Sequence, residues 1–223
     1  MQIENCEIYT GNNHKEKIPF IFLNSDRKEG KILFEEIASL TQKDFVLIAI
    51  PVNDWNDDLS PWYCEPVFKG TKPFAGKADE HLSYIETKIL PSVEEALLKM
   101  DVHSSYHALA GYSLAGLFAL YAAFTSDRFK KIVSASGSLW YPDFHEFTRS
   151  HPLSKQVDQI YLSLGDQESH TKNKLMAAVE DKTRTIASEL NETCHVFFEM
   201  NEGNHFKDPE FRTAKGIAYI LNN

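Results

Sequence analysis

The feature that most constrains the fold is an alternation of short apolar runs with longer helix-like segments along almost the whole chain. The apolar runs are continuous and rich in branched and aromatic side chains, which is typical of strands buried on both faces of a parallel sheet. These predicted strands are 18–24, 45–50, 106–110, 131–135, 159–164 and 194–199. The segments between them that are long enough for helices are 30–40, 79–99, 113–125, 172–190 and 209–221.

Repeated strand–helix–strand order predicts an α/β fold with a mostly parallel sheet and helices on both of its faces. Segment 2–10 alternates between apolar and polar residues, so we expect it to form an antiparallel strand at the N-terminal edge. The connection 51–78 is unusually long for a compact domain, and such loops are often functional. No repeat or linker interrupts the 223 residues, and we expect one domain over 1–223.

Composition excludes several classes of function. The chain has 23 Lys and Arg against 32 Asp and Glu, and a net charge of −9 argues against nucleic-acid binding. No apolar stretch is long enough for a membrane span, and the N-terminus does not resemble a secretory signal. The three cysteines, Cys6, Cys64 and Cys194, have no C-x-x-C spacing, so we expect free thiols and a cytoplasmic protein. No histidine pair has a metal-binding spacing, and we expect neither a metal nor a cofactor.

The sharpest local signal is the sequence GYSLAG at 111–116, between a predicted strand and a predicted helix. A serine on such a tight turn projects its hydroxyl above the sheet edge, and small neighbours allow the close packing that the turn needs. The backbone N–H of Leu114 would then help to bind an oxyanion. Ala115 stands where the usual motif has glycine. The alternative is a plain strand–helix turn in which Ser113 only caps the helix.

A serine nucleophile needs a base, and the base needs an orienting acid. In α/β-hydrolases the chain order is serine, acid, histidine. Here Asp166 and Glu168 follow the predicted strand 159–164, and His205 follows the last strand in the turn GNH at 203–205. We favour Glu168 as the acid, whereas Asp166 could instead cap the following helix.

With the segment SASGSLWY at 134–141, these motifs resemble the α/β-hydrolase esterase family that includes esterase D, feruloyl esterases and enterobactin-type siderophore esterases. The resemblance implies Ser113, Glu168 and His205 as the catalytic residues. It also implies a second oxyanion donor in the loop after strand 18–24. Most members carry His-Gly or Asp-Gly there, whereas this chain has Asn-Ser-Asp at 24–26. We expect the backbone N–H of Asp26 to be that donor, with Ser25 as second choice.

Aromatic residues crowd two regions that start at strand ends and could cover the same cleft. We expect the substrate pocket to be lined by Trp55 and Trp62 in the long loop, by Trp140 and by Tyr112. Alternatively, these aromatics only hold the loop on the core.

The expected function is that of a serine carboxylic-ester hydrolase that acts through an acyl-enzyme on a small ester, siderophore-like or aryl. The expected partner is this small-molecule ester, with no nucleic acid and no membrane. An acyltransferase on the same fold, or a non-catalytic binding module that uses the aromatic cleft, are the alternatives.

Overall fold

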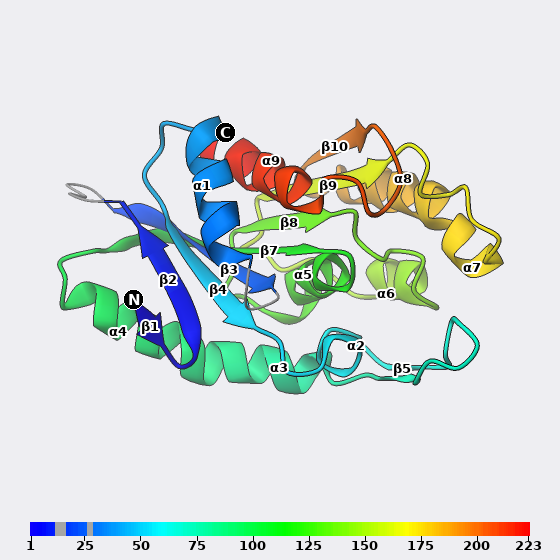
Figure 1. The fold of residues 1–223 in the computed structure, drawn as a ribbon, viewed down its shortest axis with the longest axis horizontal. Helices are drawn as coiled ribbons and strands as arrows, with labels where there is room; N and C mark the ends of the chain where they lie inside the picture. Colours follow the sequence, from blue (N-terminus) through cyan, green and yellow to red (C-terminus); the bar gives the residue numbers. More distant parts are fainter. Residues whose placement is uncertain (12–16, 26–28) are drawn as a thin grey trace.

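The computed structural model describes residues 1–11, 17–25 and 29–223. Within these residues a mixed sheet has the strand order β1-β2-β4-β3-β7-β8-β9-β10 (Figure 1). The strands are β1 (Gln2–Ile3), β2 (Cys6–Thr10), β3 (Ile18–Ser25), β4 (Val46–Pro51), β7 (Ser104–Tyr112), β8 (Lys131–Ala135), β9 (Gln159–Gly165) and β10 (His195–Asn201). From β4 to β10 all neighbouring strands pair in parallel, which confirms the predicted α/β-hydrolase-like fold class.

The N-terminal edge is antiparallel, as expected, but it consists of a hairpin rather than one strand. β1 pairs with β2, and β2 pairs antiparallel with β4. The chain reverses at Glu4 and Asn5, which have φ values of 48° and 63°. Neither residue is a glycine, and a turn within this segment was not predicted.

Helices cover both faces of the sheet (Figure 1). α1 (Gly30–Leu40) and α9 (Pro209–Asn222) lie side by side on one face, over residues such as Leu23 and Val133. The other face carries α3 (Ala78–Tyr84), the π-helical turn η1 (Ile85–Ile89), α4 (Leu90–Leu98), α5 (Leu114–Thr125) and α8 (Val179–Leu190). α5 is apolar around its whole circumference, which accounts for its position within the core.

Several helices differ from their predicted form. The helix predicted over 79–99 contains the π-helical turn η1, and the helix predicted over 172–190 is divided into α7 (Lys174–Ala177) and α8. Asn173 caps α7 through its side-chain oxygen, so the first helix starts two residues later than expected. α6 (Phe144–Ser150) was not predicted, because one short turn rich in polar residues gives little periodic signal.

The long connection 51–78 is folded against the rest of the molecule. It contains α2 (Trp55–Asp58) and the short hairpin formed by β5 (Tyr63–Cys64) and β6 (Phe74–Ala75). Trp62 Nε1 donates a hydrogen bond to Pro142 O at 3.0 Å, and Tyr141 Oη donates to Trp62 O at 2.7 Å. The two aromatic regions predicted to share one end of the sheet are therefore in direct contact.

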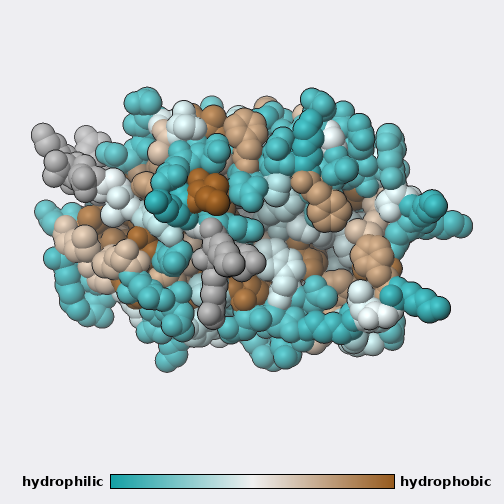
Figure 2. All heavy atoms as spheres, viewed as in Figure 1, coloured by the Kyte–Doolittle hydropathy of each residue, from teal (hydrophilic) through white to brown (hydrophobic). Residues whose placement is uncertain are grey.

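The surface is largely polar. Figure 2 shows hydrophilic residues over most of one face, with hydrophobic residues in small separate groups. Of the described helices, none combines the length and the apolar character that a bilayer crossing requires. The three cysteines carry free thiols, with Cys6 and Cys64 buried and Cys194 half-buried.

Candidate active site

Ser113 lies on a strained turn between β7 and α5. Its φ of 58° and ψ of −121° fall in a region that non-glycine residues rarely adopt. The turn is held by hydrogen bonds from Ser113 N to Ala135 O at 3.1 Å and from Ser138 N to Ser113 O at 3.0 Å. The plain helix-cap alternative does not describe this geometry, because the Ser113 side chain makes no capping hydrogen bond.

Close contacts explain why small residues surround Ser113. A Cβ atom on Gly111 would lie 2.3 Å from the backbone of Ala115 and 2.6 Å from its methyl group. Gly111 therefore leaves the space that the Ala115 methyl group needs. The departure from glycine at position 115 is compatible with the turn for this reason.

Ser113, His205 and Glu168 form one continuous line of hydrogen bonds. His205 Nε2 lies 2.9 Å from Ser113 Oγ, and His205 Nδ1 lies 2.7 Å from Glu168 Oε2. The three residues follow β7, β10 and β9, whose carboxyl ends meet at one edge of the parallel sheet. The side chain of Glu168 is 4% exposed and that of His205 is 27% exposed, so the line runs from the interior to the surface.

Asp166, the other candidate acid, lies apart from this line. It is exposed, and its Oδ1 accepts a hydrogen bond from Gly203 N at 2.8 Å. Asp166 therefore supports the turn that precedes His205 rather than contacting the imidazole.

The structure adds a residue that the sequence analysis missed. Arg212, in the first turn of α9, is 2% exposed and places its Nη1 3.1 Å from Glu168 Oε1. The same carboxylate oxygen accepts a hydrogen bond from Gly165 N at 2.7 Å. Arg212 is a charged residue on the buried face of an amphipathic helix. A charge at a position where the helical pattern expects an apolar residue could have identified it from the sequence.

The environment keeps Glu168 in its charged form. Burial alone would raise its pKa, but the hydrogen bond and charge of His205, together with the hydrogen bond from Gly165 N, outweigh burial. The net effect is a pKa of Glu168 below its ordinary value. An ionised carboxylate is the form that holds the Nδ1 proton of a histidine.

Tyr112 contacts the histidine directly. Its hydroxyl donates to His205 O at 2.6 Å, and the two rings lie with centroids 5.3 Å apart. These contacts help to fix the loop that carries His205, and the expected place of Tyr112 in the substrate pocket stays a prediction.

The predicted tryptophans lie in different surroundings. Trp62 packs on Tyr141, Phe144 and Phe147, and Trp140 is only 6% exposed. Trp55 starts α2 and is half-buried against the core. Of the aromatic residues described near His205, Phe206 is the most open, with 85% exposure.

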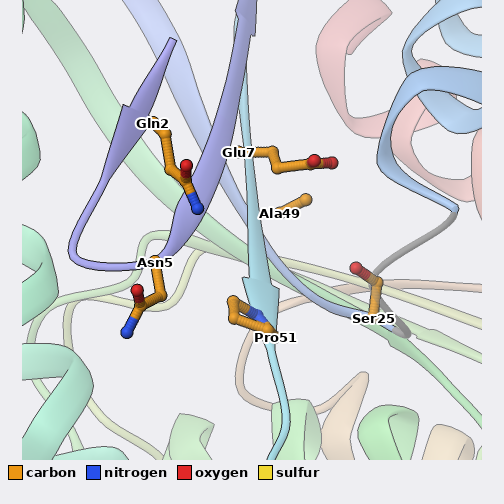
Figure 3. A pocket seen from close by; sticks show the side chains of 6 residues that line it. All are labelled: Gln2, Asn5, Glu7, Ser25, Ala49 and Pro51. Carbon is orange, nitrogen blue, oxygen red and sulfur yellow. The ribbon is translucent and has the colours of Figure 1, made fainter.

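Of the expected oxyanion donors, the structure describes Leu114 and Ser25. Leu114 is the first residue of α5, where backbone N–H groups have no acceptor within the helix. Asp26 lies outside the described residues. Ser25 is buried at the end of β3, next to β7, and faces a small polar pocket of about 120 Å³ (Figure 3). The side chains around that pocket are those of Gln2, Asn5, Glu7, Ser25, Ala49 and Pro51.

Metal-binding groups do not gather in the described residues. Over 1–11, 17–25 and 29–223, no three His, Cys, Asp or Glu side chains are grouped so that they could hold a metal ion.

Comparison with known proteins shows the family to which the chain belongs. The profile of the family described as Putative esterase matches residues 24–211. The chain belongs to the Putative esterase family. The protein is accordingly an enzyme of the carboxylesterase type, and the resemblance read from the sequence motifs is confirmed.

Individual relatives of this esterase are distant in sequence. The chain is 26% identical to the uncharacterized protein YbbA of Bacillus subtilis over 174 residues, which cover 74% of this chain and 69% of YbbA. An IroE-like serine hydrolase from Shewanella oneidensis has a TM-score of 0.75 at 19% identity, over 97% of this chain and 75% of that one. The siderophore hydrolase EstA from Aspergillus nidulans has a TM-score of 0.70 at 21% identity, over 98% and 94%. At these identities the two solved structures establish a shared fold.

Proposed function

We propose that this esterase hydrolyses a small carboxylic ester through an acyl-enzyme on Ser113, with His205 as general base and Glu168 as the orienting acid. The observation that carries the proposal is the line of hydrogen bonds from Glu168 Oε2 to His205 Nδ1 and from His205 Nε2 to Ser113 Oγ, at 2.7 and 2.9 Å. A base in contact with the hydroxyl, itself oriented by a third group, is what a serine nucleophile requires.

Acylation starts with the transfer of the Ser113 hydroxyl proton to His205 Nε2. Ser113 Oγ then bonds to the carbonyl carbon of the ester, and Glu168 stabilises the imidazolium that forms. The negative oxygen of the tetrahedral intermediate is bound by Leu114 N–H and by a second donor, for which we propose the N–H of Asp26 or of Ser25. When the intermediate collapses, the alcohol leaves with the proton from His205.

Deacylation repeats the same proton movements with water. His205 removes a proton from water, the hydroxide adds to the acyl carbon, and the bond to Ser113 Oγ breaks. The proton returns to Ser113, and the carboxylic acid is released. The half-exposed position of His205 supports this step, because water can reach the imidazole from the surface.

For the substrate we propose a small siderophore-like or aryl ester. The shared fold with a protein described as the siderophore hydrolase EstA supports this class. The open ring of Phe206 beside His205 offers an apolar surface for an aromatic group. We propose that Trp55, Trp62 and Trp140 contribute to the walls of this pocket, although Trp62 and Trp140 are largely packed on neighbouring aromatics. We also propose that the protein acts in the cytoplasm, since buried free thiols suit a reducing compartment.

The deciding experiment is labelling of the wild-type protein and of Ser113→Ala with a fluorophosphonate probe, followed by mass spectrometry of the labelled peptide. The proposal expects one label per chain, on Ser113, and none on the variant. Turnover of p-nitrophenyl acetate should fall by about 10⁶ in kcat if the three residues act as a unit. Turnover that survives in Ser113→Ala, or an unlabelled wild-type protein, would refute the assignment and leave a binding module as the explanation.

A further inference from the structure

The last residue of β7 and the loops that follow β8, β9 and β10 converge on one buried side chain, Arg212. Its Nη1 donates to Ser136 Oγ at 3.2 Å and to Glu168 Oε1 at 3.1 Å, and it lies 3.5 Å from Tyr112 Oη. Its Nη2 donates to Glu202 O at 2.9 Å. A guanidinium presents its donors in a rigid planar fork, so these contacts fix several loops relative to each other.

The position of Arg212 is unfavourable for the helix that carries it. Arg212 lies in the first turn of α9, next to Asp208 and Pro209, where the helix dipole opposes a positive side chain. Arginine is also rarely buried completely unless it is paired. Both costs indicate that this residue serves something other than the stability of α9.

We propose that Arg212 is a positioning residue of the catalytic acid: it neutralises the buried charge of Glu168 and fixes which carboxylate oxygen faces His205. Glu168 Oε1 accepts from Gly165 N at 2.7 Å and from Arg212, which leaves Oε2 for His205 Nδ1. The inference rests on the proposed function, because it gives Arg212 a role only if Glu168 orients His205.

The neighbouring backbone is shaped to admit the guanidinium. A Cβ atom on Gly165 would lie 2.9 and 3.0 Å from the two terminal nitrogens of Arg212. It would also lie 2.2 Å from Gly203 O, in the turn before His205. Glycine at position 165 therefore permits the approach of Arg212 and of the histidine loop at the same point.

The charges around the pair predict the direction of a pH effect. Within the site, Arg212 contacts Glu168 and the neutral hydroxyl of Tyr112 from β7, and His205 is bonded to the other carboxylate oxygen of Glu168. The charged neighbours outside the site are Lys207, which is paired with Glu202, and Asp208. With Arg212 removed, the Glu168–His205 pair loses its positive neighbour and takes up a proton at higher pH.

The test is the rate of fluorophosphonate labelling of Ser113 between pH 5 and pH 9 in the full-length protein and its variants. The acidic limb is the part of the plot of labelling rate against pH in which the rate falls as the pH is lowered. For Arg212→Met we expect this limb to lie about one pH unit higher than in the wild type, because a charge at this distance shifts a pKa by about one unit. Labelling at low pH should then fall about tenfold and recover at high pH. Arg212→Lys keeps the positive charge but lacks the planar guanidinium. Its acidic limb should therefore lie at the wild-type pH, while the labelling rate falls at every pH.

A double variant separates the proposed effect on Glu168 from a general loss of folding in Arg212→Met. In Glu168→Gln/Arg212→Met both buried charges are absent, so the protein should melt at a higher temperature than Arg212→Met. Its labelling rate should match that of Glu168→Gln alone, because Arg212 acts through Glu168. A double variant much slower than Glu168→Gln would overturn the inference, as would an Arg212→Met limb that stays in place while the rate falls uniformly.

The outcomes also separate this inference from the proposed function. If the wild-type protein is not labelled at Ser113, the proposed function fails. If Ser113 is labelled and only the predicted limb shift is missing, the proposed function stands and the role of Arg212 is refuted.

Discussion

The substitution Glu168→Gln keeps the shape of the side chain and removes its charge, and the structure determines how the new amide must be oriented. Two donors converge on Oε1, Gly165 N–H at 2.7 Å and Arg212 Nη1 at 3.1 Å. The amide oxygen must face these two donors. An NH₂ group in its place would be a third donor at a point where no acceptor remains. The NH₂ group then faces His205 Nδ1, in the place of Oε2.

This orientation changes the tautomer of the imidazole. His205 Nδ1 must accept from the amide, so the single ring proton moves to Nε2, which lies 2.9 Å from Ser113 Oγ. A protonated Nε2 cannot accept the serine proton. Replacement of a triad acid by its amide in trypsin lowers kcat by about 10⁴ for the same reason, and we expect a loss of that order here, with little change in KM.

Stability should fall as well. Removing one partner of a buried ion pair costs about 3–5 kcal/mol, and we expect the lower end because glutamine keeps hydrogen bonds to Gly165 and Arg212. For a chain of this size about 3 kcal/mol corresponds to a fall in Tm of about 6–12 °C. Circular dichroism melts and p-nitrophenyl acetate hydrolysis well below the melting range separate the two effects.

The matched control is Asp166→Asn, in the same loop. The asparagine oxygen can still accept from Gly203 N, as Asp166 Oδ1 does at 2.8 Å, so turnover should stay within about threefold. The reasoning is refuted if Glu168→Gln retains a tenth of wild-type turnover. Equal losses in the two variants would also refute it.

Two further predictions concern the surroundings of the site. Gly165→Ala should lower Tm and turnover together, because its Cβ would lie 2.2 Å from Gly203 O and such overpacking costs about 1–3 kcal/mol; an unchanged melting curve would contradict this. Burial lowers the pKa of His81, whose Nε2 lies 2.8 Å from Asn24 Oδ1, so the unfolded chain binds this proton more readily than the folded protein. Stability should therefore be lost as the pH falls below about 6.5, and in urea unfolding the loss from pH 7.5 to 5.5 should be smaller for His81→Gln than for the wild type.

The core of the fold was predictable because the central strands are buried on both faces. β8 and β9 are buried along their whole length, so their sequences are mostly apolar and can be recognised as strands without knowledge of their partners. The N-terminal hairpin was not predictable in the same way. Its turn places Glu4 and Asn5 in the left-handed region, and the pairing of β1 with β2 and of β2 with β4 holds them there.

The candidate site was predictable where a residue lies just past a strand end. Ser113, Glu168 and His205 all follow parallel strands, so their order along the chain and the direction of the strands bring them to one edge. Arg212 lies inside a helix, 44 residues after Glu168, and its partner follows from the packing of α9 on the sheet. No spacing rule within one sequence connects these two positions.

Three strained backbone positions lie near the proposed catalytic residues. Ser113, Ser136 and Asp208 are non-glycine residues with φ values of 58°, 44° and 50°, in the segments that follow β7, β8 and β10. Each such conformation costs about 1–3 kcal/mol, and strain of this kind persists only where the surrounding structure enforces it. Ser136 is held by hydrogen bonds from its N to Ser163 O at 2.9 Å and from Arg212 to its Oγ at 3.2 Å. The guanidinium of Arg212 therefore contacts both the strained residue Ser136 and the carboxylate of Glu168. The strain at Ser136 and the orientation of the proposed acid thus depend on the same side chain.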